Sequence, residues 1–177
     1  MSASPRTHGG FTLIEILVVL VVVGLLAALA VANLGGSAQN REWENEVREI
    51  YLLMQTAAEQ AILNNEELGW LLEGNSYRFV RFDDQATRWE KAQERLFRPR
   101  SLPEWLVLTP QVESGLPRLT TRESTLRPDV VFFSSGETTP FELQATVGRD
   151  TSRVHRIVAD GIGGLEWLKP GDDEADR

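Results

Sequence analysis

The side chains best suited to chemistry in this sequence are few and far apart. Ser134 or Ser135, His155 and Asp160 supply the residue types of a hydrolase triad. The strand-to-helix turn that exposes a nucleophilic serine in many hydrolases, with the pattern G-x-S-x-G, does not occur in the sequence. Since a trio of this kind arises by chance in a chain of this length, we expect the protein not to be an enzyme and to have no catalytic residues.

Sequence patterns for metals and cofactors are also missing. His8 and His155 are far apart in the chain, and cysteine is absent, so no pair of ligands has the spacing of a zinc site. Asp83 and Asp84 lack the spacing of a calcium loop, and the glycines of residues 161–164 lack the lysine of a phosphate-binding loop. We therefore expect no metal site and no cofactor. We interpret the acidic segment and the glycine-rich segment as turns.

The charge balance limits the class of partner. The 177 residues include 18 basic and 26 acidic side chains, which give a formal net charge of −8. An acidic chain repels phosphate backbones, so we expect no nucleic-acid partner. One segment is basic, although Glu90 and Glu94 lie within it; its cations are Arg88, Lys91, Arg95, Arg98 and Arg100. We interpret this segment as a solvated face or as a contact with an acidic neighbouring subunit.

The most informative acid is Glu15, which lies near the start of an apolar segment. No polar side chain occurs from Ile16 to Ala32, and the apolar run extends from Phe11 to Leu34 with few interruptions. As a helix this run is about 36 Å long, which is enough to cross a hydrocarbon core of about 30 Å. Arg6 precedes the run and acids follow it, which favours a cytoplasmic N-terminus. The alternative is a cleaved signal peptide that ends near residues 30–32, but such apolar regions are shorter.

Glu15 has a physical cost in these surroundings. A carboxylate at the centre of a bilayer costs about 2.5 to 3.5 kcal/mol, and a segment that serves only as an anchor has no use for one. We therefore expect Glu15 to have a cationic partner. The alternative is an acid that reaches the membrane interface with its charged end.

The residues around Glu15 resemble a processing motif. The string Gly9-Gly10-Phe11-Thr12-Leu13-Ile14-Glu15, followed by an aliphatic run, is similar to the prepilin cleavage motif of the type IV pilin and type II secretion pseudopilin superfamily. The resemblance implies that a prepilin peptidase cuts between Gly10 and Phe11 and then N-methylates Phe11. It also implies an assembly role for Glu15, which would pair with the new ammonium of its own or a neighbouring chain and set the axial register of the helices.

The rest of the chain predicts a second helical segment and then antiparallel strands. From Arg41 to Asn64, apolar or small residues recur at steps of three and four, which is typical of an amphipathic helix that packs on a sheet. They are Trp43, Val47, Ile50, Tyr51, Met54, Ala57, Ala58, Ala61 and Ile62. Short alternating runs follow, bounded by turn residues. They predict a strand over Ser76–Phe82, a hairpin of Asp129–Ser134 with Phe141–Val147, and a hairpin of Val154–Ala159 with Leu165–Leu168.

These segments predict an α+β fold in which a long N-terminal helix packs on a C-terminal antiparallel β domain. We expect five parts along the chain: a leader peptide (1–10), a membrane-spanning or filament-core helix (11–34), an amphipathic helix (35–66), a periplasmic β domain (67–169) and a disordered acidic tail (170–177).

Two later segments narrow the resemblance. Arg127–Phe133 and Ser135–Phe141 are similar to the C-terminal region of the H-type minor pseudopilins of type II secretion systems. This resemblance implies a pilin-like fold and a subunit near the tip of the periplasmic pseudopilus that helps to export folded exoproteins across the outer membrane. It implies these partners: tip minor pseudopilins, the major pseudopilin, the prepilin peptidase, the inner-membrane assembly platform and, before extraction, the inner membrane itself. The alternative is a minor type IV pilin of the FimT or FimU type, acting in pilus assembly, adhesion or DNA uptake.

Overall fold

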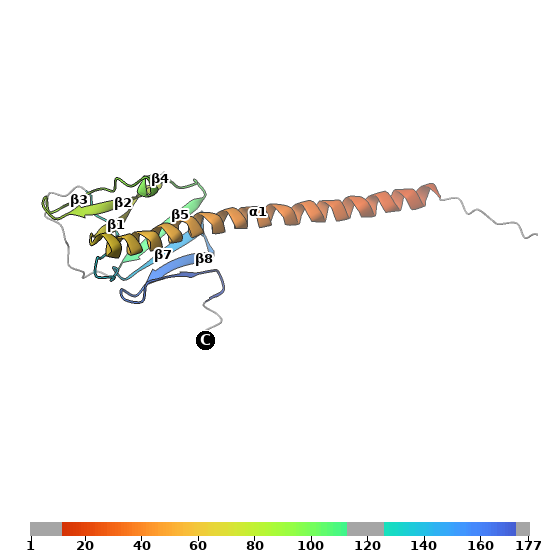
Figure 1. The fold of residues 1–177 in the computed structure, drawn as a ribbon. Coiled ribbons are helices and arrows are strands. Elements are labelled where there is room, and N and C mark those ends of the chain that lie inside the picture. Colours follow the sequence, from red (N-terminus) through yellow and green to blue (C-terminus); the bar gives the residue numbers. More distant parts are fainter. Residues whose placement is uncertain (1–11, 113–125, 173–177) are drawn as a thin grey trace, which may run out of the picture. The chain divides into compact units, whose positions relative to one another are not determined.

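The computed structural model describes residues 12–112 and 126–172 (Figure 1). They form a long helix α1 (Leu13–Asn64), a single turn of 3-10 helix η1 (Arg95–Phe97) and β strands in two antiparallel sheets. The chain divides into two compact units, Met1–Glu42 and Trp43–Arg177, and all the strands belong to the second. The predicted fold class, α+β with a long N-terminal helix and antiparallel strands, is confirmed.

The part of α1 within the second unit buries one stripe of side chains. Its members lie at steps of three and four and are almost fully buried: Trp43, Val47, Ile50, Met54, Ala57 and Ala61. The predicted amphipathic helix is therefore confirmed at these positions. Ile62 was expected in the same stripe, but it is 52% exposed and that prediction is wrong. Ile62 follows the buried Ala61 by one position, so it lies about 100° around the helix from the buried stripe.

The first sheet has the strand order β3-β2-β1-β6, and β4 pairs with β2 beside β3. The predicted strand at Ser76–Phe82 is confirmed, and it forms a tight hairpin with β1 through Gly74, whose φ of +60° suits glycine. The strands of this sheet are β1 (Leu68–Glu73), β2 (Ser76–Asp83), β3 (Arg88–Lys91), β4 (Arg100–Ser101) and β6 (Val130–Phe132).

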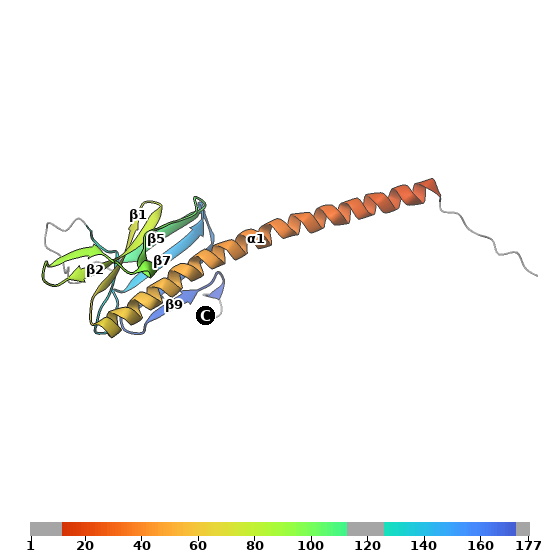
Figure 2. The same cartoon turned by 45° about the horizontal axis from the view of Figure 1, so that its top comes forward.

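The second sheet has the strand order β5-β7-β8-β9. The predicted hairpin of β8 with β9 is confirmed, since Arg156 pairs with Leu168 and Ala159 with Leu165. In Figure 2 strand β9 runs alongside the second half of α1. The strands of this sheet are β5 (Leu106–Val112), β7 (Phe141–Val147), β8 (Asp150–Ala159) and β9 (Leu165–Leu168).

The predicted hairpin of Asp129–Ser134 with Phe141–Val147 is wrong. Both segments contain strands, but β6 pairs with β1 in the first sheet, whereas β7 lies between β5 and β8 in the second. The connection crosses from one sheet to the other, and it touches β6 through one bridge between Phe132 and Thr138. Alternation of side chains indicates a strand but does not identify its neighbour, because pairing is decided by contacts between distant parts of the chain.

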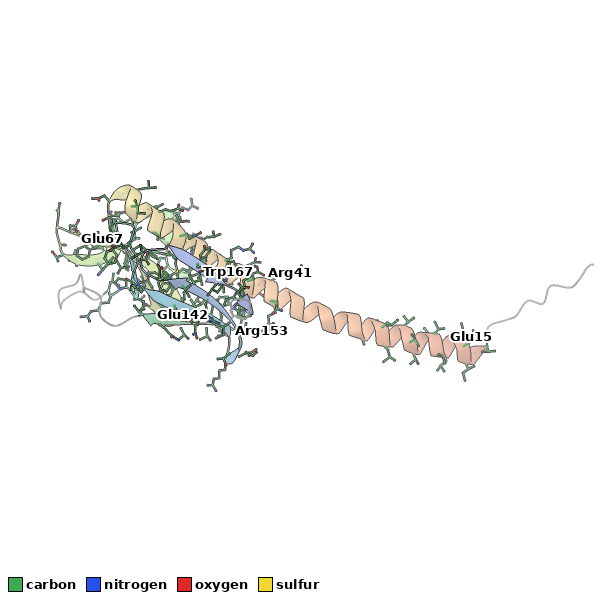
Figure 3. The ribbon with its side chains drawn as sticks, turned by 90° about the horizontal axis from the view of Figure 1, so that it is seen from below. Glu15, Arg41, Glu67, Glu142, Arg153 and Trp167 are labelled. Atoms are coloured by element: carbon green, nitrogen blue, oxygen red, sulfur yellow. The ribbon has the colours of Figure 1, made fainter. Side chains whose placement is uncertain are left out.

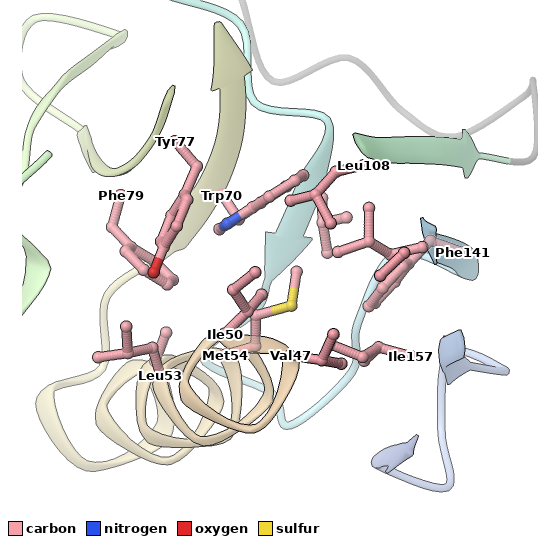
Figure 4. Packing of buried hydrophobic residues seen from close by; sticks show 14 of the residues in the cluster. Val47, Ile50, Leu53, Met54, Trp70, Tyr77, Phe79, Leu108, Phe141 and Ile157 are labelled. Atoms are coloured by element: carbon pink, nitrogen blue, oxygen red, sulfur yellow. The ribbon is translucent and has the colours of Figure 1, made fainter. Parts of the chain in front are cut away.

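The core fills the space between α1 and the two sheets (Figure 4). Trp70 and Phe79 come from the first sheet, Leu143 and Ile157 come from the second, and all four are almost completely buried. Figure 4 shows these layers meeting the helix at Ile50 and its neighbours. Burying large apolar side chains in this way contributes about 1.5 to 3 kcal/mol each, so the helix and both sheets depend on one another for stability.

The start of the predicted disordered tail forms a turn. The backbone N–H of Lys169 donates to Oδ2 of Asp172 at 2.7 Å, and the N–H of Asp172 donates to the carbonyl of Lys169 at 3.1 Å. Residues 173–177, the remainder of the predicted tail, lie outside the described residues.

Candidate functional site

The first turn of α1 contains the candidate assembly residue, Glu15. The predicted processing residues Gly10 and Phe11 lie outside the described residues. The N–H of Glu15 donates to the carbonyl of Thr12 at 3.1 Å and to its hydroxyl Oγ1 at 3.3 Å. Thr12 therefore caps the helix, and the spacing Thr-x-x-Glu is that of a capping box. The Thr-x-x-Glu spacing is visible in the sequence, but Glu15 was interpreted there only as a costly carboxylate that needs a cationic partner, so the cap was not predicted.

The apolar side chains that follow the cap have no cover within the chain. Every large apolar side chain that the structure describes from Leu13 to Leu26 is exposed, from 85% for Leu13 down to 48% for Val22. They surround the helix on all sides, and Glu15 is the only charged residue among them (Figure 3). A helix that is apolar all round is normally enclosed by a membrane or by other apolar helices. This segment therefore provides a surface for association.

Within the part of the chain that the structure describes, no helix combines the length and the apolar character required to span a membrane.

The residues considered above as a possible hydrolase triad each form hydrogen bonds with other groups. The hydroxyl of Ser134 donates to Oε1 of Glu67 at 3.0 Å. His155 accepts from the indole of Trp167, and Asp160 accepts from backbone N–H groups of its own turn. The described residues also contain no cluster of three or more side chains suited to holding a metal ion.

The basic segment around β3 and β4 is partly neutralised by acids of the same chain. Arg88 pairs with Glu90 at 2.7 Å, and Arg100 pairs with Glu49 of α1 while also donating to the carbonyl of Leu96 at 3.2 Å. Two of the five cations of this segment are therefore held by acids of the same chain.

A charged cluster fastens strand β9 to α1 on the surface of the second unit. Glu44 pairs with Lys169 at 2.8 Å and with Arg48 at 3.2 Å, and both cations lie over the ring of Trp167, at 5.1 and 5.8 Å from its centroid. The hydrogen bond from Lys169, with its positive charge, holds the pKa of Glu44 below its usual range. Figure 3 shows Trp167 beside the helix. The cluster connects the two ends of the second unit's sequence.

A buried histidine lies beneath this cluster. Nδ1 of His155 accepts a hydrogen bond from Nε1 of Trp167 at 3.2 Å, and its ring makes a T-shaped contact with the ring of Trp43, with the centroids 4.4 Å apart. Burial is the main reason that the pKa of His155 is lowered, because desolvation disfavours the imidazolium. The sequence suggested His155 only as a possible ligand or base, and no local pattern could have shown that it joins β8 to both tryptophans.

Comparisons with known proteins agree with this architecture. The chain matches the family described as Type II transport protein GspH over residues 46–163, and the Prokaryotic N-terminal methylation motif over residues 5–31. It is 32% identical to the Type II secretion system protein H of Pseudomonas aeruginosa over 89% of this chain and 94% of that protein. It is 28% identical to the protein of the same name from Aeromonas hydrophila over 96% of this chain and 99% of that protein.

A solved structure shows the same fold. The structure of the minor pseudopilin EpsH from the type 2 secretion system of Vibrio cholerae superposes with a TM-score of 0.60 at 26% sequence identity, covering 73% of this chain and 97% of that one. The pilin-like character of the predicted fold is thereby confirmed.

Proposed function

We propose that this chain, which belongs to the Type II transport protein GspH family and is a minor pseudopilin of type II secretion, is a structural subunit near the tip of a periplasmic pseudopilus. There it helps to export folded exoproteins across the outer membrane. The observation that carries this proposal is the apolar surface of α1 from Leu13 to Leu26, which is exposed on all sides and has Glu15 as its only charge. Such a surface needs a membrane or other apolar helices around it.

The same surface serves two environments in turn. Before assembly, the apolar run from Phe11 to Leu34 anchors the chain in the inner membrane as a single span, with the second unit in the periplasm. The length of the run, about 36 Å as a helix, supports the span, and the position of Arg6 before the run supports the orientation. After extraction by the assembly platform, the helices of neighbouring pseudopilins replace the lipid. The exchange of one apolar environment for another involves little loss of hydrophobic free energy.

Processing prepares the helix for this exchange. The prepilin peptidase cuts between Gly10 and Phe11 and methylates Phe11, a step supported by the match to the methylation motif over residues 5–31. Glycine before the cut leaves the backbone unobstructed for the protease. The ammonium of Phe11, four residues before Glu15 in the sequence, then pairs with the Glu15 of its own or of a neighbouring subunit and neutralises a carboxylate that would otherwise be costly in apolar surroundings.

The partners of the chain are other pseudopilins, and we assign them by position along the filament. Tip minor subunits lie beyond the chain and the major subunit lies below it. The second unit has a single core and its own helix-to-sheet contacts, which support a domain that remains folded while the helix moves between membrane and filament.

The N-terminus of the mature protein tests this proposal. In cells that contain the prepilin peptidase, mass analysis of the purified chain should give a start at methylated Phe11, and deletion of the peptidase should restore the leader. Gly10→Leu should block the cut, whereas the matched change Gly9→Ala in the same leader should leave it intact. A leader retained in the presence of the peptidase, or a mature start at Asn33, would contradict the proposal.

A further inference from the structure

Three apolar side chains at one end of the second unit are exposed. Ile62 and Leu63 end helix α1 and are 52% and 80% exposed, and Ile162 in the turn between β8 and β9 is 84% exposed. Among the large apolar residues that the structure describes from residue 43 onward, Leu63 and Ile162 are the most exposed. We refer to Ile62, Leu63 and Ile162 as the end patch.

The turn that carries Ile162 is held in one conformation. Oδ1 of Asp160 accepts hydrogen bonds from the N–H of Ile162 at 2.9 Å and from the N–H of Gly163 at 2.6 Å. These bonds lower the pKa of Asp160, so its carboxylate stays charged near neutral pH. Gly161 and Gly164 supply φ angles of +103° and +86° that other residues adopt only with strain. The isoleucine is thus presented on a fixed turn, which reduces the entropy lost when a partner binds it.

A loop from the crossover between the sheets joins this turn to the helix end. The N–H of Thr138 donates to the carbonyl of Gly161 at 2.9 Å. Two residues earlier, Gly136 lies against Ile62, since a Cβ placed on it would be 3.6 Å from Cδ1 of Ile62. Glu137 lies between these two contacts and is exposed. The helix end, the loop and the turn therefore form one end of the second unit.

The charges at this end are predominantly negative. Glu59, Glu137 and Asp160 are exposed. Glu66 lies next to the helix end and pairs with Arg81 at 3.7 Å, so the charge of this fourth acid is partly balanced within the chain. An apolar surface edged by carboxylates is complementary to an apolar surface edged by lysine or arginine.

We propose that the end patch is a docking site for another pseudopilin subunit, one that presents apolar side chains flanked by lysine or arginine. The inference rests on the proposed function, because it requires neighbours in a filament. A second copy of this chain fits poorly, since it would bring the same carboxylates into apposition. An anionic lipid surface is repelled by the same charges. A basic-edged subunit satisfies both the apolar and the charged parts of the surface.

Site-specific photo-crosslinking of the full-length chain, in cells that carry its secretion system, tests this inference. p-Benzoylphenylalanine replaces Ile162 in one variant and Val107 in a matched control, because Val107 is also exposed but lies in β5 at the opposite edge of the same sheet. The adduct at position 162 should contain another pseudopilin and should map to a peptide with lysine or arginine. Its yield should exceed that of the control by about tenfold or more, since burial of one isoleucine is worth that factor in affinity.

Charge reversal tests the carboxylate edge. Glu137→Lys should lower the adduct at position 162 by about fivefold or more, whereas Glu104→Lys, an identical charge change at an exposed site next to β5, should leave it unchanged. Both positions are exposed, so both variants should fold.

Each outcome has a defined meaning. An adduct with a second copy of the chain or with lipid overturns the inference, and so does an equal effect of the two charge reversals. A chain that is processed at Phe11 and supports secretion, but gives no adduct at position 162, overturns the inference and leaves the proposed function standing. A chain that keeps its leader in the presence of the peptidase overturns both.

Discussion

Replacing Gly69 by alanine should destabilise the second unit through one close contact. A Cβ at position 69 of β1 would lie 2.6 Å from Cβ of Pro128 and 3.0 Å from Cγ2 of Val80. Carbon atoms are in favourable contact at about 3.5 to 4.0 Å, so the segment that contains Pro128 must move away. That segment leads into β6, where Val131 pairs with Gly69 itself. The substitution should therefore weaken the pairing of β1 with β6.

The size of the effect follows from two opposing contributions. Alanine restricts the unfolded chain more than glycine does, which stabilises a protein by about 0.4 to 1 kcal/mol where the native conformation accepts it. Overpacking of a rigid contact costs about 1 to 3 kcal/mol, and the proline ring has no rotamer through which it could retreat. The free energy of unfolding should fall by about 1 to 2 kcal/mol, which lowers Tm by about 2 to 8 °C in a chain of this size.

Urea unfolding of the full-length chain in detergent measures this change. The 5 tryptophans of the chain, including the fully buried Trp70, provide the fluorescence signal. The matched control is Gly24→Ala, because a Cβ at that helical position meets no atom within 4 Å. The control should be at least as stable as the unmodified chain, since alanine favours a helix. Unchanged or increased stability of Gly69→Ala would refute the close-contact argument.

Further substitutions test the remaining contacts. Glu15→Val should leave membrane insertion intact but reduce the amount of chain in sheared pseudopilus fractions. Thr12→Ala removes only the cap, at a cost of about 0.5 to 2 kcal/mol in helix stability, and should reduce that amount less. Equal losses in the two variants would favour a capping role for Glu15 alone. Because burial lowers the pKa of His155 in the folded state, its contribution to stability is complete above the unfolded pKa of about 6.5 and falls as the pH drops below that value, by at most about 1.4 kcal/mol per pH unit. The difference in urea midpoint between pH 7.5 and pH 5.5 should therefore be smaller in His155→Gln, and an identical difference in both proteins would contradict this assignment. Glu44→Gln removes the ion pairs to Lys169 and Arg48 and should destabilise the chain at low salt but not in about 1 M salt, where exposed charges are screened; a salt-independent loss would show that packing, not charge, explains the effect.

Features that depend on neighbouring residues were predictable from the sequence. The buried stripe of α1 follows from the spacing of Trp43, Val47 and Ile50, because side chains three and four apart share a helix face. The hairpin of β8 with β9 follows from two alternating runs joined by a glycine-rich turn. Glu15 was identified because a carboxylate within an apolar run is costly in itself. The cap by Thr12 was also within reach, since its Thr-x-x-Glu spacing is local.

Features that depend on distant residues were decided only by the tertiary structure. The strand at Val130–Phe132 was recognised, but its partner is β1 and not β7, because alternation records which face is buried and not which strand lies alongside. Ile62 continues the three-and-four spacing of the apolar residues, yet it lies near the end of α1 and is 52% exposed. His155 meets Trp43 and Trp167 only after a helix and two strands have packed together. A helix face, a hairpin or a cap depends on residues that are close together in the sequence. Each contact between distant segments forms only when the loops between those segments close, and the stability of the whole core determines which closure occurs.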